Sequence, residues 1–303
     1  MKQQNFISAV IYVNNNENEI PFFFNSIKNI FDEHFEYYEI VAVNASSSDA
    51  SLQVLAEWDK AFDKPLTVIH MSTHQSREAC MNAGLDISIG DFIYEFDCIK
   101  ENVPWDFVYK AYEMAISGND VVSVSPDKVN LKSKLFYHIF NRNCNSPYSI
   151  SSDIFRLVSR RALHRAHAIN PYLLYRKGAF ACSGLKCVTL KYKGRNVYTT
   201  DNKWELFIDS LLLYTQFGYK VSIGISITMA LITLSLFIYA IVIYSLNISI
   251  TGWTSMMMMI SLGLSSIFII STVIIKYLDL LLKLLNQSER YLVENVEKIK
   301  NER

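Results

Sequence analysis

Residues 6–13 read FISAVIYV and residues 38–43 read YEIVAV, and each of these short apolar runs ends in a polar turn. Runs of this length, without alternating polar residues, are typical of strands buried on both faces of a parallel sheet. Between them, residues 20–31 carry apolar side chains at helical spacing. The order strand, helix, strand predicts the beginning of an α/β fold.

The same alternation continues toward residue 96. Helical spacing recurs in residues 50–62 and 77–89, and apolar strand-like runs recur in residues 66–71 and 91–96. The chain is therefore predicted to contain a doubly wound, Rossmann-like α/β domain with a mostly parallel sheet. Ligands bind beyond the carboxyl ends of the strands in such sheets. Those ends are predicted at residues 14–17, 44–49 and 97–101.

The charges of the 303-residue chain are sorted by region. Half of the residues are apolar and 19% are charged, a composition that excludes disordered and collagen-like chains. Residues 1–127 hold 7 Lys and Arg against 20 Asp and Glu, whereas residues 128–203 hold 15 against 2. Such a basic segment suits anionic headgroups or a phosphorylated lipid substrate; the alternative is the ordinary positive flank of a membrane span.

Residues 221–275 contain no Asp, Glu, Lys or Arg. A membrane span needs about 20 apolar residues, so this stretch is too long for one span and predicts a transmembrane hairpin over residues 221–276. A buried pair of helices in a soluble domain is the alternative. Because Lys220 and Lys276 flank the stretch and its loop is uncharged, we expect a multi-pass protein of the inner (plasma) membrane. The α/β domain and both termini are then expected to be cytoplasmic.

These observations predict four regions: an α/β domain (1–203), a juxtamembrane amphipathic helix (204–220), the hairpin (221–276) and a cytoplasmic C-terminal amphipathic helix (277–303). In the last region apolar residues repeat every seven positions, at Leu278, Leu285, Leu292 and Ile299. This stripe predicts packing between protomers, hence a homo-oligomer, or packing against the α/β domain.

Several segments resemble family 2 glycosyltransferases of the GT-A fold. They are, in chain order, residues 10–17 (VIYVNNNE), 82–85 (NAGL), 89–93 (IGDFI), 152–161 (SDIFRLVSRR), 175–178 (YRKG) and Arg195 with 201–204 (DNKW). The similarity is to the polyprenyl-phosphate branch, typified by dolichol-phosphate mannose synthase and the bactoprenol glucosyltransferases. Tyr12 stands where the family usually has proline.

The resemblance implies an enzyme that moves a sugar from a nucleotide-sugar to polyprenyl (undecaprenyl or dolichyl) phosphate at a membrane. No nucleic-acid partner is expected. The alternative is a catalytically silent GT-A relative that acts as a membrane assembly or regulatory subunit.

The donor side of the predicted site departs from the family pattern. The resemblance assigns the donor to Asn15, Glu17, Asn44 and Asp97. Ala45 replaces a polar residue of the usual DDGS segment, and Ile99 replaces the second aspartate of the usual DxD motif. Asp97 is then expected to be catalytic and to bind Mg²⁺ or Mn²⁺. Glu95 lies on the same strand face and is either a shifted second metal ligand or a carboxylate paired inside the sheet.

The acceptor side resembles the family pattern more closely than the donor side does. The resemblance assigns phosphate and acceptor binding to Arg156, Arg160, Arg195 and Lys203, for which solvated surface charge is the alternative. Arg holds phosphate oxygens in a bidentate fork. Asp153 is expected to be a second catalytic residue near the acceptor, or to form a salt bridge with a neighbouring arginine. A phosphate monoester has a second pKa of about 6, so the acceptor needs cations more than a strong base.

Overall fold

The computed structural model describes residues 2–60, 62–99, 103–143, 148–169, 173, 175–195 and 293–299, with scattered positions between 224 and 281. The chain forms two compact units, Met1–Lys203 with Ser288–Arg303, and Trp204–Gln287. The predicted juxtamembrane helix (204–220) and most of the predicted hairpin (221–276) lie outside the described residues. Within the described part of the chain, no helix has the length and apolar character needed to cross a bilayer.

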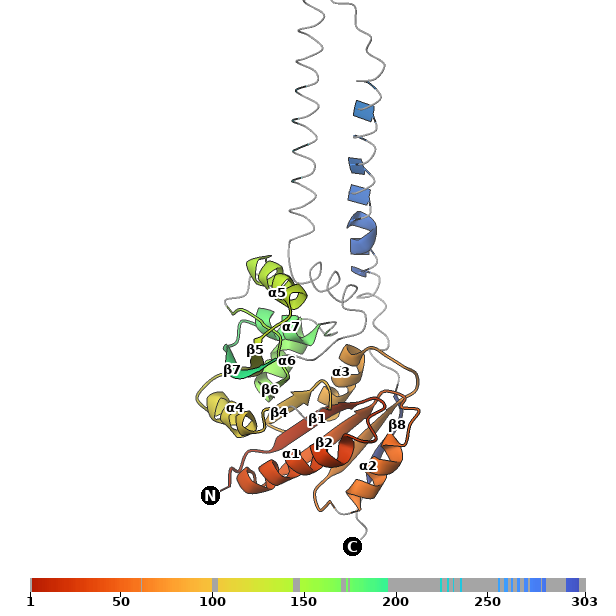
Figure 1. The fold of residues 1–303 in the computed structure, drawn as a ribbon, viewed down its shortest axis with the longest axis vertical. Coiled ribbons are helices and arrows are strands. Elements are labelled where there is room, and N and C mark those ends of the chain that lie inside the picture. Colours follow the sequence, from red (N-terminus) through yellow and green to blue (C-terminus); the bar gives the residue numbers. More distant parts are fainter. Residues whose placement is uncertain are drawn as a thin grey trace, which may run out of the picture. The chain divides into compact units, whose positions relative to one another are not determined.

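The first unit contains an eight-stranded sheet with the order β7-β5-β6-β4-β1-β2-β3-β8 (Figure 1). The strands are β1 (Ile7–Val13), β2 (Tyr38–Asn44), β3 (Leu66–Met71), β4 (Phe92–Phe96), β5 (Val121–Lys128), β6 (Phe155–Ser159), β7 (Cys187–Arg195) and β8 (Val293–Ile299). Strands β1 to β4 run parallel, β5 and β7 pair in parallel, and β6 lies antiparallel between β4 and β5. The predicted α/β fold with a mostly parallel sheet is confirmed.

Helices cover both faces of this sheet. They are α1 (Ile20–His34), α2 (Ser51–Asp59), α3 (Arg77–Ile87), α4 (Asp106–Ile116), α5 (Leu131–Asn143), α6 (Arg160–Ile169) and α7 (Arg176–Cys182). Alternate residues of β1, such as Ile7 and Ile11, join the core beneath α1. Val10 points the other way, toward Gly84 of α3. The four strands and three helices predicted between residues 6 and 96 are present, with ends shifted by at most a few residues.

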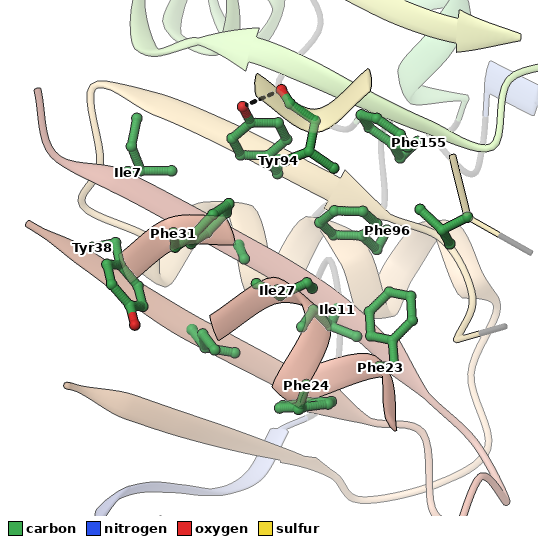
Figure 2. Close-up of a cluster of buried hydrophobic side chains, with 14 of the residues drawn as sticks. Ile7, Ile11, Phe23, Phe24, Ile27, Phe31, Tyr38, Tyr94, Phe96 and Phe155 are labelled. Carbon is green, nitrogen blue, oxygen red and sulfur yellow. Dashed lines mark hydrogen bonds between the residues drawn. The ribbon is translucent and has the colours of Figure 1, made fainter. Parts of the chain in front are cut away.

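Aromatic packing under α1 fixes the position of β4 (Figure 2). The Phe23 ring meets Phe96 edge to face at 5.4 Å between centroids, and Phe31 lies 5.3 Å from Tyr94. The Tyr94 hydroxyl donates a hydrogen bond to the carbonyl of Val108 in α4 at 2.8 Å. All these side chains are buried, so β4 is held rigidly up to its carboxyl end. The next residue in the chain is Asp97.

Gly90 allows β4 to start directly against the backbone of β1. A Cβ atom at this position would lie 2.6 Å from the Ser8 nitrogen and 2.9 Å from the Ile7 carbonyl carbon. We expect Gly90→Ala to destabilise the unit by about 1–3 kcal/mol through overpacking, measured by urea unfolding of the full chain. Gly224→Ala, in the second unit, is a control for the substitution itself, because a Cβ there meets none of the described atoms within 4 Å. Equal stability of both variants would contradict this close approach.

The prediction of a C-terminal amphipathic helix over residues 277–303 is wrong for residues 293–299. These residues form β8, which pairs antiparallel with β3. The seven-residue apolar spacing favoured a helix, but the edge of β3 offers unpaired backbone groups, and strand pairing satisfies them. Ile299 therefore does not continue a helical stripe from Leu278, and this basis for a homo-oligomer is lost.

Candidate active site

The loops after β1 and β2 hold three predicted donor-site residues at one edge of the sheet. Asn15 accepts a hydrogen bond from the backbone N–H of Ser48 at 2.8 Å. Glu17 accepts one from the backbone N–H of Ala50 at 2.9 Å. Asn44, the last residue of β2, accepts one from the backbone N–H of Ser47 in the following loop at 3.1 Å. These side chains therefore shape the two loops that border the predicted donor site.

Asp97 follows β4 directly and pairs with an arginine of the antiparallel neighbour. Arg156 of β6 lies opposite Glu95 in the strand register. Its Nη2 is 3.2 Å from Asp97 Oδ2, and its Nη1 is 3.3 Å from Glu95 Oε2. The Glu95 side chain is fully buried, whereas 27% of the Asp97 side chain is exposed. Asp97 is thus the carboxylate of this pair that a ligand can reach.

Arg176, the first residue of α7, joins three carboxylates although its side chain is fully buried. Its Nε lies 2.8 Å from Glu78 Oε2, and its Nη2 lies 2.6 Å from Asp97 Oδ1. Its Nη1 pairs with Glu95, and its backbone N–H also donates to Glu78. A single guanidinium therefore ties the start of α3 and the end of β4 to the start of α7.

Lys177 and Asp153 extend this arrangement. The Lys177 ammonium forms an ion pair with Asp153 and donates to the Tyr137 hydroxyl at 3.1 Å. Asp153 Oδ2 also lies 3.1 Å from Arg156 Nε, so the salt bridge considered for Asp153 is present. We call the following seven residues the charge cluster: Glu78, Glu95, Asp97, Asp153, Arg156, Arg176 and Lys177.

Burial and ion pairing act in opposite directions on the pKa values in the charge cluster. Burial alone would raise the pKa of Asp97, but Arg176 and Arg156 outweigh it and hold that pKa well below its usual range. Burial raises the pKa of Glu95 in spite of the same two arginines. Burial would lower the pKa of Arg176, but the carboxylates, Asp97 first, raise it overall. Asp97 and Arg176 therefore both stay charged at neutral pH.

The other predicted phosphate-binding cations lie elsewhere. Arg160 donates to the carbonyls of Ser88 and Gly90 at 2.7 and 3.0 Å, at the end of the sheet where β4 begins. Arg195 ends β7, the outermost strand on its side of the sheet. Lys203 lies outside the described residues. Of the predicted phosphate-binding cations that the structure describes, Arg156 alone belongs to the charge cluster.

The surroundings of Asp97 do not fit a divalent metal ion. Mg²⁺ and Mn²⁺ require several oxygen ligands, and both Asp97 oxygens already pair with guanidinium groups. Glu95, the alternative ligand, is paired inside the sheet with the same two arginines. Ile99 is buried in the apolar core and has no ligand atom. Across the described residues, no group of three or more His, Cys, Asp or Glu side chains is placed to hold a metal.

Four residues of this site were not assigned a role from the sequence: Glu78, Tyr137, Arg176 and Lys177. Arg176 and Lys177 lie in the YRKG segment that contributed to the family resemblance. Glu78 lies in the first turn of the helix that follows the carboxyl end of β3, where ligands bind in such sheets. The position of Glu78 just after a predicted strand could therefore have marked it as a candidate site residue. Nothing in the sequence indicated that it pairs with Arg176.

Comparison with known proteins agrees with this architecture. A model of the family described as Glycosyl transferase family 2 matches residues 8–184, more than half of the chain. Uncharacterized glycosyltransferase YkcC from Bacillus subtilis is 23% identical, covering 98% of this chain and 95% of its own length. A prophage bactoprenol glucosyl transferase homolog from Escherichia coli is 25% identical, covering 74% of this chain and 77% of its own.

A solved structure of glucosyl-3-phosphoglycerate synthase from Mycobacterium tuberculosis is also similar. It contains Mn²⁺, UDP-glucose and phosphoglyceric acid. It is 14% identical and aligns with a TM-score of 0.49 over 69% of this chain and 79% of its own.

Proposed function

Because the chain belongs to glycosyl transferase family 2, we propose that it moves a sugar from a nucleotide-sugar donor to a polyprenyl phosphate such as undecaprenyl or dolichyl phosphate. The acceptor class is supported by the bactoprenol glucosyl transferase homolog, which is similar to three quarters of the chain. Family membership supports the transferase reaction itself.

The observation that carries the proposal is the charge cluster at the carboxyl end of β4. Buried ion pairs add little net stability, because the cost of removing charges from water offsets their attraction. Seven ionisable side chains gathered at the edge where α/β sheets bind ligands are therefore poorly explained by stability alone. Shifted pKa values at such an edge, as for Asp97 and Glu95, are typical of active sites.

The proposed reaction needs charge and alignment rather than a strong base. A phosphate oxygen of the acceptor attacks the anomeric carbon of the donor sugar and forms a new C–O bond. The bond from that carbon to the terminal phosphate of the donor breaks, and the nucleoside phosphate leaves with the electron pair. Since the second pKa of a phosphate monoester is about 6, the acceptor is already anionic at neutral pH. The protein contributes orientation and cations that offset the negative charge.

We assign roles from exposure and pairing. Asp97, with its partly exposed carboxylate, accepts hydrogen bonds from donor hydroxyl groups. Arg156 and Lys177 bring positive charge to the acceptor side, and Asp153 positions both of them through its two oxygens. The loop residues around Asn15 and Asn44 border the donor. Arg195 and Lys203 remain predictions for the acceptor phosphate.

We further propose that the chain is anchored in the membrane by residues 221–276, so that the active site meets its lipid acceptor on the cytoplasmic leaflet. The uncharged run of residues 221–275 supports this anchoring. Large apolar side chains are also exposed at described positions of the second unit: Leu231, Met256, Ile260, Ile267, Ile274 and Ile275. Exposed apolar surface of this kind is typical of contact with lipid or with a partner.

The test uses the full-length protein in vesicles that contain undecaprenyl phosphate. Radiolabelled UDP-, GDP- and CMP-sugars are added one at a time, and label in the organic extract is measured. We expect lipid-linked label with one donor class. Asp153→Asn is expected to lower kcat by about 10²-fold, because Arg156 and Lys177 lose the carboxylate that positions them.

Arg161→Gln is the matched control, since Arg161 is exposed and pairs with Asp120 away from the charge cluster. Its rate is expected to equal that of the unmodified protein. Absence of lipid-linked label with every donor would contradict the proposed function and favour a catalytically silent membrane subunit. An unchanged rate for Asp153→Asn would contradict the role assigned to that residue.

A further inference from the structure

Arg77 is a cation at the edge of the charge cluster. It is the first residue of α3, next to Glu78, and its guanidinium carbon lies 5.2 Å from the centroid of the Tyr12 ring. Tyr12 is the penultimate residue of β1, whose carboxyl end borders the predicted donor site. A guanidinium over an aromatic face is held by a cation–π interaction. The ring of Tyr12 therefore keeps Arg77 beside the donor edge of the sheet.

Among the described residues, the guanidinium of Arg77 is not ion-paired as the neighbouring cations are, and its charge helps to lower the pKa of Asp97. Arg156, Arg176 and Lys177 each pair with carboxylates. Arg77 forms no ion pair with any carboxylate in the part of the chain that the structure describes, and its buried Nε has no hydrogen-bond partner there. A guanidinium carries five donors and no acceptor, so it is suited to bind phosphate oxygens bidentately.

The start of α3 adds to this preference for an anion. The helix spans Arg77–Ile87 and follows β3, whose carboxyl end lies at the same edge of the parallel sheet as the ends of β1 and β4. Free N–H groups and the helix dipole favour a phosphate at a helix N-terminus. Ser76 caps one of these groups, from Ala79, and leaves others for a ligand or water.

Ile99 and Tyr12, two departures from the family pattern, both favour binding of a phosphate without a metal ion. Ile99 removes a carboxylate that would bind metal, and both oxygens of the remaining Asp97 are paired with arginines. Tyr12, in place of the usual proline, provides the surface that holds Arg77. One change removes a metal ligand, and the other supplies an aromatic ring on which the cation of Arg77 is held.

We infer that this chain binds the diphosphate of its nucleotide donor without a divalent metal ion, and that Arg77, held on the ring of Tyr12, supplies the positive charge. The inference rests on the proposed function, because it concerns the donor of that reaction. It requires no change in the charge cluster, in which ionised Asp97 stays paired with Arg176 and Arg156.

The inference is tested by isothermal titration of the full-length, detergent-solubilised protein with UDP, GDP and CMP. Each titration is done in EDTA and again with Mn²⁺ or Mg²⁺. We expect one nucleotide to bind in EDTA with a Kd that Mn²⁺ and Mg²⁺ leave unchanged. Arg77→Gln is expected to weaken that binding by about 10-fold to 100-fold, as the loss of a charge-assisted hydrogen-bond pair predicts.

Three further variants separate the charge of Arg77 from general damage to the fold. Arg77→Lys keeps the charge and is expected to bind more tightly than Arg77→Gln. Tyr12→Leu removes the aromatic ring and is expected to weaken binding, whereas Tyr12→Phe keeps the ring and is expected to preserve it. Arg161→Gln removes a cation elsewhere and is expected to bind normally. Thermal unfolding confirms that each protein is folded.

The possible outcomes have different consequences. Binding in EDTA that depends on Arg77 and on the ring at position 12 supports the inference. Binding that appears only with Mn²⁺ or Mg²⁺, or that Arg77→Gln leaves unchanged, overturns the inference and leaves the proposed function intact. No binding of any of the three nucleotides under any condition overturns both, because the proposed donor is itself a nucleotide.

Discussion

Replacing Arg176 by glutamine is expected to destabilise the first unit by about 3–5 kcal/mol, the range found when one partner of a buried ion pair is removed. The Arg176 side chain is fully buried and pairs with Glu78, Glu95 and Asp97. Without it, Glu78 loses its ion-pair partner, and Glu95 and Asp97 keep only Arg156 as a directly paired arginine. Urea unfolding of the full chain, followed by circular dichroism, measures the loss.

The loss is expected to depend on pH. Asp97 has a pKa below its usual range, so it contributes stability above the unfolded pKa of about 4, and this contribution is lost as the pH falls through the folded pKa. In Arg176→Gln, Asp97 loses the cation that lowers its pKa most, so that pKa rises and protonation relieves the unpaired charge. The difference in stability between the two proteins is therefore expected to shrink as the pH falls from 7 toward 4.

Two comparisons keep this prediction falsifiable. The double variant with Glu95→Gln removes one of the unpaired charges and is expected to recover part of the stability lost in Arg176→Gln. Arg161→Gln breaks an ion pair whose arginine is 71% exposed, and it is expected to cost much less stability than Arg176→Gln. A similar loss for Arg161→Gln and Arg176→Gln, or a loss independent of pH, would show that the buried pairing is not the cause.

The part of the fold that sequence predicts well is the part made of local pattern. Strands β1 and β2 are mostly apolar, and both are buried along their full length. The polar residues Ser8 and Glu39 within them are hydrogen-bonded to each other. The helix between these strands repeats apolar residues at a spacing that brings Phe23, Ile27 and Phe31 to one face. Local periodicity sufficed here, because each element buries the side chains that its own spacing places together.

Elements that depend on distant partners were predicted less well. Residues 293–299 contain Glu and Lys between valines and isoleucine, a pattern compatible with a helix, yet they pair with β3 more than 200 residues earlier in the chain. Strand β6 lies antiparallel between two parallel neighbours, an order that the sequence of β6 does not encode locally. Strand pairing is decided by which edge is free, and that information is not local.

In the candidate site, too, the features set by local sequence pattern were predicted and those set by long-range pairing were not. The carboxyl ends of β1, β2 and β4 were predicted from the strand pattern, and Asp97, Asp153 and Arg156 do come together at the end of β4. Arg160 is only four residues from Arg156, but the strand carries it to the opposite end of the sheet. The pairing of Arg176 with Asp97 joins residues 79 positions apart, and spacing in the sequence gives no sign of it.

Restoring the second aspartate of the usual motif, by Ile99→Asp, is expected to destabilise the protein without creating a metal site. Ile99 is 1% exposed and belongs to the apolar core with residues such as Phe96 and Val103. A carboxylate there loses the packing of the isoleucine side chain and buries a charge without a partner. We expect a loss of about 3–5 kcal/mol in urea unfolding, and no stabilisation by added Mn²⁺.

Ile99→Val is the matched control, since it keeps an apolar side chain and removes one methylene group, at a cost of about 0.5–1.5 kcal/mol. The two variants distinguish two explanations for the missing aspartate. If position 99 were simply a degenerate surface position, Ile99→Asp would be as stable as Ile99→Val, and Mn²⁺ would raise its Tm. The other explanation is that the metal site was lost at both positions, through apolar packing at Ile99 and arginine pairing at Asp97. A single aspartate at position 99 then cannot restore metal binding, because both oxygens of Asp97 remain paired with Arg156 and Arg176.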